Sequence, residues 1–125
     1  MELSRIGSIF TVIFLSIICG CASNPSISSL KPEQRARLNT IQVYKLGVDK
    51  PYKIIGTVKG LSCHRNAYQK QLLTEEEAIE GVKLEAAILG ADAVINVACQ
   101  VNSGTDWVNN CWSSIVCVGD AIKYE

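Results

Sequence analysis

The sequence predicts an α+β fold in which one helix packs on a mostly antiparallel sheet, with the elements in the order ββαββ. Four stretches rich in β-branched residues are bounded by turn residues, as strands are; they cover residues 41–47, 52–63, 93–101 and 113–124. One segment, residues 74–89, instead repeats its apolar residues at helical spacing. A chain of 125 residues has room for one such domain, which we place at residues 40–125.

Residues 1–20 are expected to be a lipoprotein signal peptide. An apolar run at 6–19 follows Arg5; it is shorter than the roughly 20 residues of a membrane-spanning helix and fits the apolar core of a signal peptide. The run ends in Ile-Cys-Gly-Cys, which resembles a bacterial lipobox. Because the residue before the cleaved bond is small in such motifs, cleavage is expected after Gly20, so that Cys21 becomes the lipidated N-terminus. The alternatives are an uncleaved signal anchor or an apolar cytosolic N-terminus.

Residues 21–39 are predicted to form a lipidated, flexible tether. They are rich in Ser, Pro and charged residues and show almost no apolar periodicity. Fully extended, the residues from Ala22 to Asn39 would reach about 60 Å at ~3.3 Å each. A triacylated terminus carries more than one acyl chain, which is enough for stable anchoring without a transmembrane helix. The tether would therefore hold the domain near its membrane.

The first two predicted strands are separated by a short turn. Ile41, Val43 and Lys45 alternate along the first strand. The turn VDKP follows at 48–51, and the β-branched segment YKIIGTVKGLSC at 52–63 is the second strand. The polar stretch HRNAYQKQLL after it is expected to be an irregular loop.

The predicted helix has clear start and stop signals. Thr74 and Glu77 have the spacing of a capping box, and the glutamates at 75–77 place negative charge at the helix N-terminus. Gly90 is the expected stop. The apolar residues that recur every three or four positions, and so should face the sheet, are Ile79, Val82, Ala86 and Leu89.

The cysteines of the mature domain favour two disulfides. The chain has six cysteines; Cys19 is expected to leave with the signal peptide and Cys21 to carry the lipid. An even number in a small exported domain indicates disulfides, because the envelope is oxidising. Four cysteines allow three pairings. The remaining cysteines are Cys63, Cys99, Cys111 and Cys117.

We expect the last two strands to form a hairpin, and the register of this hairpin favours one of these pairings. Val101 would lie near Ser114 or Ile115 close to the hairpin loop. Antiparallel register then places Cys99 close to Cys117, at the cross-strand Cα distance of about 4.5–5.5 Å that suits a disulfide. The predicted disulfides are therefore Cys99–Cys117 and, by elimination, Cys63–Cys111.

A metal or redox site is the alternative use of these cysteines. Cys111 and Cys117 are separated by five residues, a looser spacing than that of paired zinc ligands, and the chain has no C-x-x-C redox motif. His64, the single histidine, lies beside Cys63 and is a further candidate ligand. We expect it instead to be an exposed residue at the end of a strand. The prediction is thus no metal, and no cofactor besides the covalent lipid on Cys21.

Charge and motifs also bear on the class of function. The chain has 12 basic and 12 acidic side chains, so nothing in its charge indicates a nucleic-acid partner. It shows no Ser-His-Asp arrangement and no phosphate-binding loop, and we predict that it is not an enzyme. Trp107 and Trp112 are the expected partner contacts, because aromatic residues are enriched at interfaces. The alternative is that Trp112 packs over the Cys63–Cys111 bridge.

The C-terminal half, with CQVNSGT, a further Cys and SSIVCVGDAI, resembles the RcsF family of outer-membrane lipoproteins. The upstream segments GTVKGLSC and LGADAV are similar to the family as well. The resemblance extends from about Ile41 to the end of the chain and includes the lipobox. The positions that carry it in the C-terminal half are Cys99, Val101, Ser103, Gly104, Thr105, Cys111, Val116, Cys117, Gly119 and Ala121.

This resemblance implies the two disulfides in the pairing already predicted. It also implies an outer-membrane lipoprotein whose domain faces the periplasm and acts as an envelope-stress sensor. The expected partners are an inner-membrane regulator of the Rcs phosphorelay and, further, outer-membrane barrel or assembly proteins. Ala22 stands where inner-membrane retention is associated with Asp, which agrees with the outer membrane. The alternatives are a structural or assembly lipoprotein of the envelope without a signalling role, and a thiol-redox or metal-binding protein.

Overall fold

The computed structural model describes residues 23–66, 68 and 72–125, so the predicted signal peptide and Cys21 lie outside the described residues. The fold is α+β, as predicted. Its elements, in chain order, are η1 (Ile27–Ser29), α2 (Pro32–Leu38), β1 (Gln42–Val43), β2 (Tyr52–His64), α3 (Glu75–Leu89), β3 (Ala93–Asn102) and β4 (Ser113–Tyr124).

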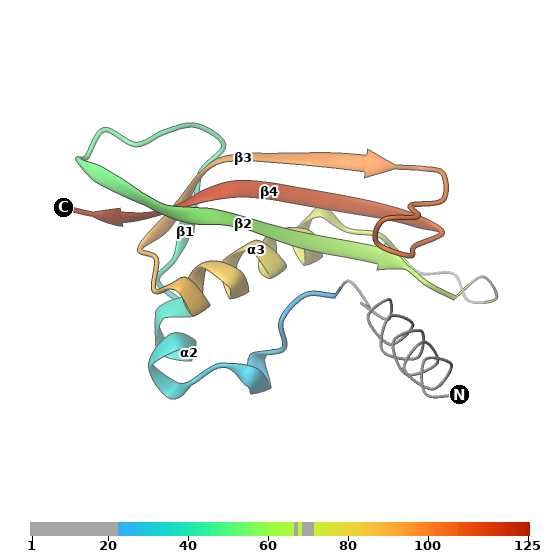
Figure 1. The fold of residues 1–125 in the computed structure, drawn as a ribbon, viewed down its shortest axis with the longest axis horizontal. Coiled ribbons are helices and arrows are strands. Elements are labelled where there is room, and N and C mark those ends of the chain that lie inside the picture. Colours follow the sequence, from blue (N-terminus) through green and yellow to red (C-terminus); the bar gives the residue numbers. More distant parts are fainter. Residues whose placement is uncertain (1–22, 67, 69–71) are drawn as a thin grey trace, which may run out of the picture.

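The strands form one mixed sheet in the order β1-β3-β4-β2. Both pairings of β4, with β2 and with β3, are antiparallel, and only the short edge strand β1 runs parallel to its neighbour. Helix α3 lies along one face of the sheet (Figure 1). The prediction of one long helix on a mostly antiparallel sheet is therefore confirmed.

A β-bulge in β3 interrupts the alternation of side chains. The register shifts between Ile95 and Ala98, and Asn96 has a positive φ of 55°. Val94 and Val97 consequently both belong to the core under the helix, although they are three residues apart. The bulge also ends the regular part of β1, because the N–H of Val97 donates to the carbonyl of Tyr44 at 3.1 Å. Strand β1 is shorter than predicted for this reason.

Helix α3 begins and ends at the predicted residues. The Thr74 hydroxyl accepts from the N–H of Glu77 at 3.2 Å, and Gly90 follows the helix with a φ of 76°. The Glu77 carboxylate accepts from the Ser62 hydroxyl of β2 at 2.6 Å, so it ties the helix to the sheet. Of the predicted apolar stripe, Val82 is fully buried whereas Leu89 is 47% exposed. Leu89, in the last turn of the helix, still faces β2, since its Cδ1 would lie 3.0 Å from a β-carbon at Gly56, but only part of its side chain is covered.

The helix approaches β2 very closely at Gly60. A β-carbon at this position would overlap the carbonyl oxygen of Ala78 and would lie 2.6 Å from the backbone nitrogen of Val82. Only a glycine therefore permits this distance between α3 and the sheet. The residues at this contact are covered: Val58 is 1% exposed, and Val82 and Ala78 are fully buried.

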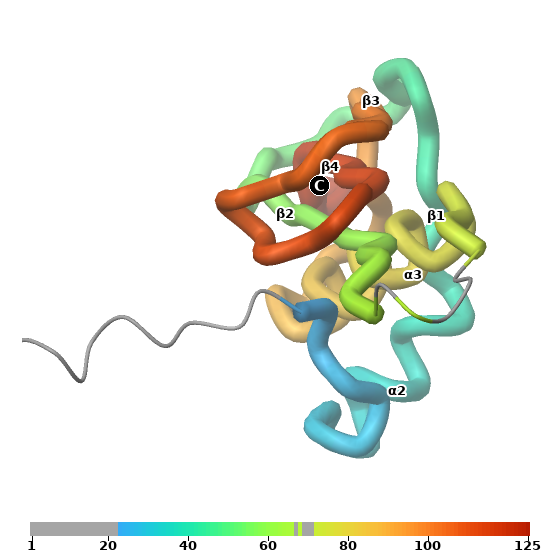
Figure 2. Tube along the Cα trace, turned by 90° about the vertical axis from the view of Figure 1, so that its right-hand side faces the viewer, coloured from blue at the N-terminus to red at the C-terminus, as the bar shows by residue number. Residues whose placement is uncertain are grey.

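The segment predicted as a flexible tether differs from the prediction. Leu30 and Leu38 are 2% and 8% exposed and belong to the core cluster under the sheet. Helix α2 starts with Pro32 in its first turn and packs against α3 (Figure 2). The apolar residues of this segment are spaced too far apart to form a periodic pattern. They are buried because α3 offers a second apolar side to cover.

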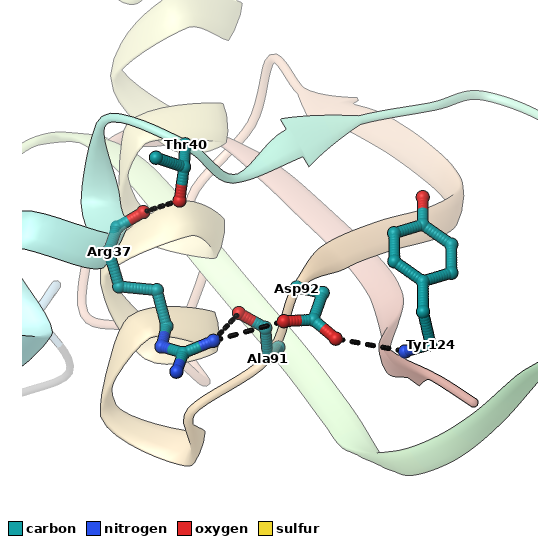
Figure 3. A network of polar contacts seen from close by, with 5 residues as sticks. All are labelled: Arg37, Thr40, Ala91, Asp92 and Tyr124. Carbon is teal, nitrogen blue, oxygen red and sulfur yellow. Dashed lines mark hydrogen bonds and ion pairs between the residues drawn. The ribbon is translucent and has the colours of Figure 1, made fainter.

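A polar network fixes the C-terminal end of this segment (Figure 3). Arg37 of α2 forms an ion pair with Asp92 at 3.0 Å and also donates to the carbonyl of Ala91. The second Asp92 oxygen accepts from the backbone N–H of Tyr124 at 2.9 Å, and the Thr40 hydroxyl donates to the carbonyl of Arg37. Helix α2 is thus bonded both to the turn after α3 and to the end of β4.

Candidate functional site

The two predicted disulfides are present and lie on opposite faces of the sheet. Cys99 and Cys117 are direct partners in the β3–β4 ladder, with their Cα atoms 4.0 Å apart, and Cys117 is part of the core under α3. Cys63 is joined to Cys111 with a Cα distance of 5.5 Å. Because its neighbour Ser62 faces the helix, Cys63 faces the other side of the sheet.

The Cys63–Cys111 bridge fastens the long β3–β4 loop, residues 103–112, to the end of β2. Within this loop Asp106 and Cys111 exchange backbone hydrogen bonds of 2.8 and 3.0 Å, and Asn110 has a φ of 55°. The N–H of Trp112 then donates to the carbonyl of His64 at 2.7 Å. The loop is therefore a small, cross-linked turn of defined shape.

A buried polar network supports the loop from beneath. The Asp106 carboxylate is 7% exposed and accepts from the Asn109 side-chain amide at 2.7 Å and from the Ser114 hydroxyl at 2.6 Å. These two hydrogen bonds, the Asn109 amide first, lower the pKa of Asp106 from 3.8 to about 2 and outweigh the burial that would raise it. Lys59 of β2 donates to Asn109 at 3.0 Å, and Asn102 of β3 donates to Ser114 at 3.4 Å. The network thus joins the loop to three strands.

The two tryptophans singled out in the sequence lie on the exposed surface of the loop. Trp107 is 86% exposed, its neighbour Val108 87%, and Trp112 54%. Trp107 and Trp112 line one cavity together with Cys111 and Arg65. Both tryptophans therefore line one cavity beside the Cys63–Cys111 bridge, and about half of Trp112 is covered. We call Trp107, Val108 and Trp112 the aromatic tip.

The first described residues of the chain lie at the same end of the domain. The Asn24 side chain bonds both backbone groups of Leu61: it accepts from the N–H and donates to the carbonyl, each at 2.7 Å. It thereby covers part of the open edge of β2, where Glu85 also accepts from the N–H of Lys59. Ser23 and Asn24 line a cavity with Cys63. The chain thus leads from this end of the sheet toward Cys21.

The remaining candidate groups are placed as follows. His64 is half buried at the end of β2, and its Nε2 lies 2.8 Å from the carbonyl of Asn66. Within residues 23–66, 68 and 72–125 no three metal-binding side chains gather at one point. Among the helices of those residues, none has the length and apolarity to cross a membrane.

Sequence reasoning missed the polar network and the Asn24 contact. One local signal was present, since Asp106 and Asn109 have the spacing at which an aspartate caps a turn, and the Asp106 carboxylate does accept from the N–H of Asn109 at 3.1 Å. Ser114 looked like an ordinary strand residue. Asn24 gave no signal, because its partner Leu61 is far away in the sequence.

Fold and site together define a small α+β domain stapled by two disulfides, one of which fastens the β3–β4 loop to β2. The sequence model of the RcsF lipoprotein family matches residues 21–125. The chain therefore belongs to the RcsF lipoprotein family, which makes it a lipoprotein of the kind anchored in a membrane of the cell envelope.

Other comparisons add little to this assignment. A search of curated proteins finds no match. Among solved structures, a protein of unknown function from Pediococcus pentosaceus ATCC 25745, of the DUF74 family, is similar at 18% identity and a TM-score of 0.46; the alignment covers 68% of this chain and 98% of that one.

Proposed function

We propose that this chain is an outer-membrane lipoprotein, acylated on Cys21, that senses envelope damage and signals to an inner-membrane regulator of the Rcs phosphorelay. The observation that carries the proposal is the family match, which starts at Cys21 and runs to the last residue. The two disulfides support the envelope as the compartment, because such bonds persist in oxidising surroundings.

The role proposed for the domain is recognition rather than chemistry. The β3–β4 loop is fastened by the Cys63–Cys111 bridge and the sheet is covered by α3 (Figure 1), so the described part of the domain offers surfaces of defined shape for contact. In this proposal the lipid keeps the domain on the periplasmic side of the outer membrane, and contact with the inner-membrane regulator transmits the signal.

The test uses a strain that lacks the gene and carries a reporter of Rcs phosphorelay activity. The full chain, Cys21→Ala and the matched control Cys19→Ala are expressed at equal levels, and the outer membrane is damaged. We expect the full chain and Cys19→Ala to restore the response, because Cys19 is removed with the signal peptide. Cys21→Ala should be absent from the outer-membrane fraction and should change the response.

An unchanged reporter on deletion and on overproduction would overturn the signalling role. Co-purification with barrel-assembly or cell-wall components, without an inner-membrane partner, would then favour the structural or assembly lipoprotein. If Cys19→Ala and Cys21→Ala behave alike, Cys21 is not the anchor.

A further inference from the structure

The aromatic tip is an unusual surface for so small a domain. Trp107 and Val108 each expose more than four fifths of their side chain, at the outermost part of the β3–β4 loop. Large apolar side chains exposed side by side mark a site of contact with a partner or a membrane. The Cys63–Cys111 bridge and the Asp106 network hold the loop in one shape, so these side chains stay exposed instead of folding back.

The described residues next to the proposed lipid anchor indicate what covers this surface. Asn24 is held at Leu61, and Ser23 lies in a cavity with Cys63, which is bonded to Cys111 next to Trp112. Only Ala22 separates Ser23 from Cys21, a distance of about 7 Å of extended chain. Figure 1 shows the first described residues below the half of the sheet in which β2 ends and the β3–β4 loop lies.

We propose that the aromatic tip rests in the interfacial layer of the membrane to which Cys21 is attached, with the indoles of Trp107 and Trp112 among the phospholipid headgroups. This inference rests on the lipidation of Cys21 proposed above. It assigns a lipid surface, rather than a protein, to the two tryptophans.

The chemistry of the tip suits such a layer. Tryptophan is enriched at membrane interfaces because its ring is apolar and its N–H still finds a polar partner there. Val108, which follows Trp107 in the sequence, adds apolar area to the tip. Arg65 lines the cavity shared by the two tryptophans, and its cationic group suits phosphate headgroups. An anchor this near keeps the tip at a high effective concentration at the surface, so weak side-chain affinity is sufficient.

The other end of the domain does not meet these conditions. Leu46, in the β1–β2 loop, and Ile54, near the start of β2, are also exposed, at 78% and 52%. The β1–β2 loop and the start of β2 lie at the opposite end of the sheet from the β3–β4 loop (Figure 1). With the tip in the membrane, this end and the C-terminus point away from the membrane and stay open to a protein partner.

The two tryptophans are the only ones in the chain, so their fluorescence reports on the tip alone. The purified lipidated protein is reconstituted into vesicles of phosphatidylethanolamine and phosphatidylglycerol, with and without brominated acyl chains, and floated on a density gradient. We expect brominated lipids to remove most of the tryptophan emission. We also expect acrylamide to quench this emission less than it quenches that of the unlipidated Cys21→Ala protein in buffer without detergent. The single-tryptophan variants Trp107→Phe and Trp112→Phe show which indole enters the layer.

The matched control carries the reporter at the other end: Leu46→Trp in a chain with Trp107→Phe and Trp112→Phe, which brominated lipids should not quench. If the protein floats but Trp107 and Trp112 keep full emission with brominated lipid, the tip inference is wrong and lipidation stands. If the protein does not float, the anchor at Cys21 and the tip inference both fall. If brominated lipids do not quench Trp107 and Trp112, and these residues crosslink to a protein in cells, the tip binds a protein partner instead of lipid.

Discussion

The two faces of the sheet are held together by different physical means. On the face covered by α3, the core is apolar and closely packed, and the Cys99–Cys117 bridge lies inside it. On the other face, the β3–β4 loop is held by the Cys63–Cys111 bridge and by hydrogen bonds to the buried Asp106 carboxylate. The helix face depends on apolar packing, and the loop depends on a covalent bond and a buried charge.

Because of this difference, the helix face accounts for the stability of the domain, and the loop accounts for the exposure of the two tryptophans. The helix face buries enough apolar surface to keep the sheet folded, whereas the loop buries mainly polar groups and has no apolar core of its own. A loop held in this way can keep Trp107 and Trp112 exposed, because its own fold does not need them. The following predictions are ordered by the size of the effect expected.

Removing either disulfide should destabilise the domain, but by different amounts. The bridges close loops of 48 and 18 residues, which predicts about 4 kcal/mol for Cys63–Cys111 and about 3 kcal/mol for Cys99–Cys117 in the chain-entropy account. Denaturant unfolding of the two paired alanine variants, Cys63→Ala with Cys111→Ala and Cys99→Ala with Cys117→Ala, measures both. A larger loss for the second pair would mean that the helix face relies on its bridge and not on packing.

A single methyl group on the helix face should be nearly as damaging. Gly60→Ala places a carbon against the backbone of Ala78, so α3 must move away from β2, at a cost of about 3 kcal/mol. The control is Gly104→Ala in the exposed loop, where no atom lies within 4 Å of the added carbon and the change should stay within about 0.5 kcal/mol. Equal stability of the two variants in denaturant unfolding would contradict the close approach of helix and sheet.

The charge under the loop should contribute less than either bridge. Asp106→Asn replaces one acceptor oxygen with a donor that faces Asn109 and Ser114, and we expect a loss of about 2 kcal/mol. Asp49→Asn, at an exposed position in the β1–β2 loop, should leave stability unchanged and serves as the control. Hydrogen exchange should show faster opening in residues 103–112 of the Asp106→Asn protein, while α3 stays protected.

The same carboxylate predicts an acid-sensitive loop. Its pKa is lowered from 3.8 to about 2 on folding, so its contribution is complete above about pH 4 and is lost as the pH falls through about 2. The lost contribution is at most about 2 kcal/mol. Unfolding free energies of the wild type and Asp106→Asn should therefore converge between pH 4 and pH 2. Parallel pH profiles would show that Asp106 is not held as a charged acceptor.

Local patterns predicted the elements and the disulfides because their causes are local or follow from strand register. Thr74 and Gly90 delimit α3 by capping, and the hairpin register placed Cys99 close enough to Cys117 for a disulfide. The register argument succeeded even though β3 is bulged, because the bulge at Asn96 lies on the far side of Cys99 from the hairpin loop.

The features that could not be predicted depend on distant partners. Leu30 and Leu38 look like isolated apolar residues in a polar segment until α3 provides a surface for them. Asn24 acquires its role from the edge of β2, and Ser114 acquires its role from Asp106. Long-range contacts of this kind leave no periodic trace in the sequence.

Disulfide mapping under non-reducing conditions tests the contrast between the two faces most directly. Trypsin releases Cys63 between Lys59 and Arg65, and cleavage after Trp107 and Trp112 separates the other three cysteines from one another. The account predicts two cross-linked peptide pairs, Cys63 with Cys111 and Cys99 with Cys117. Cys111 joined to Cys117 would contradict it, because the loop would then be fastened to its own hairpin and not to β2.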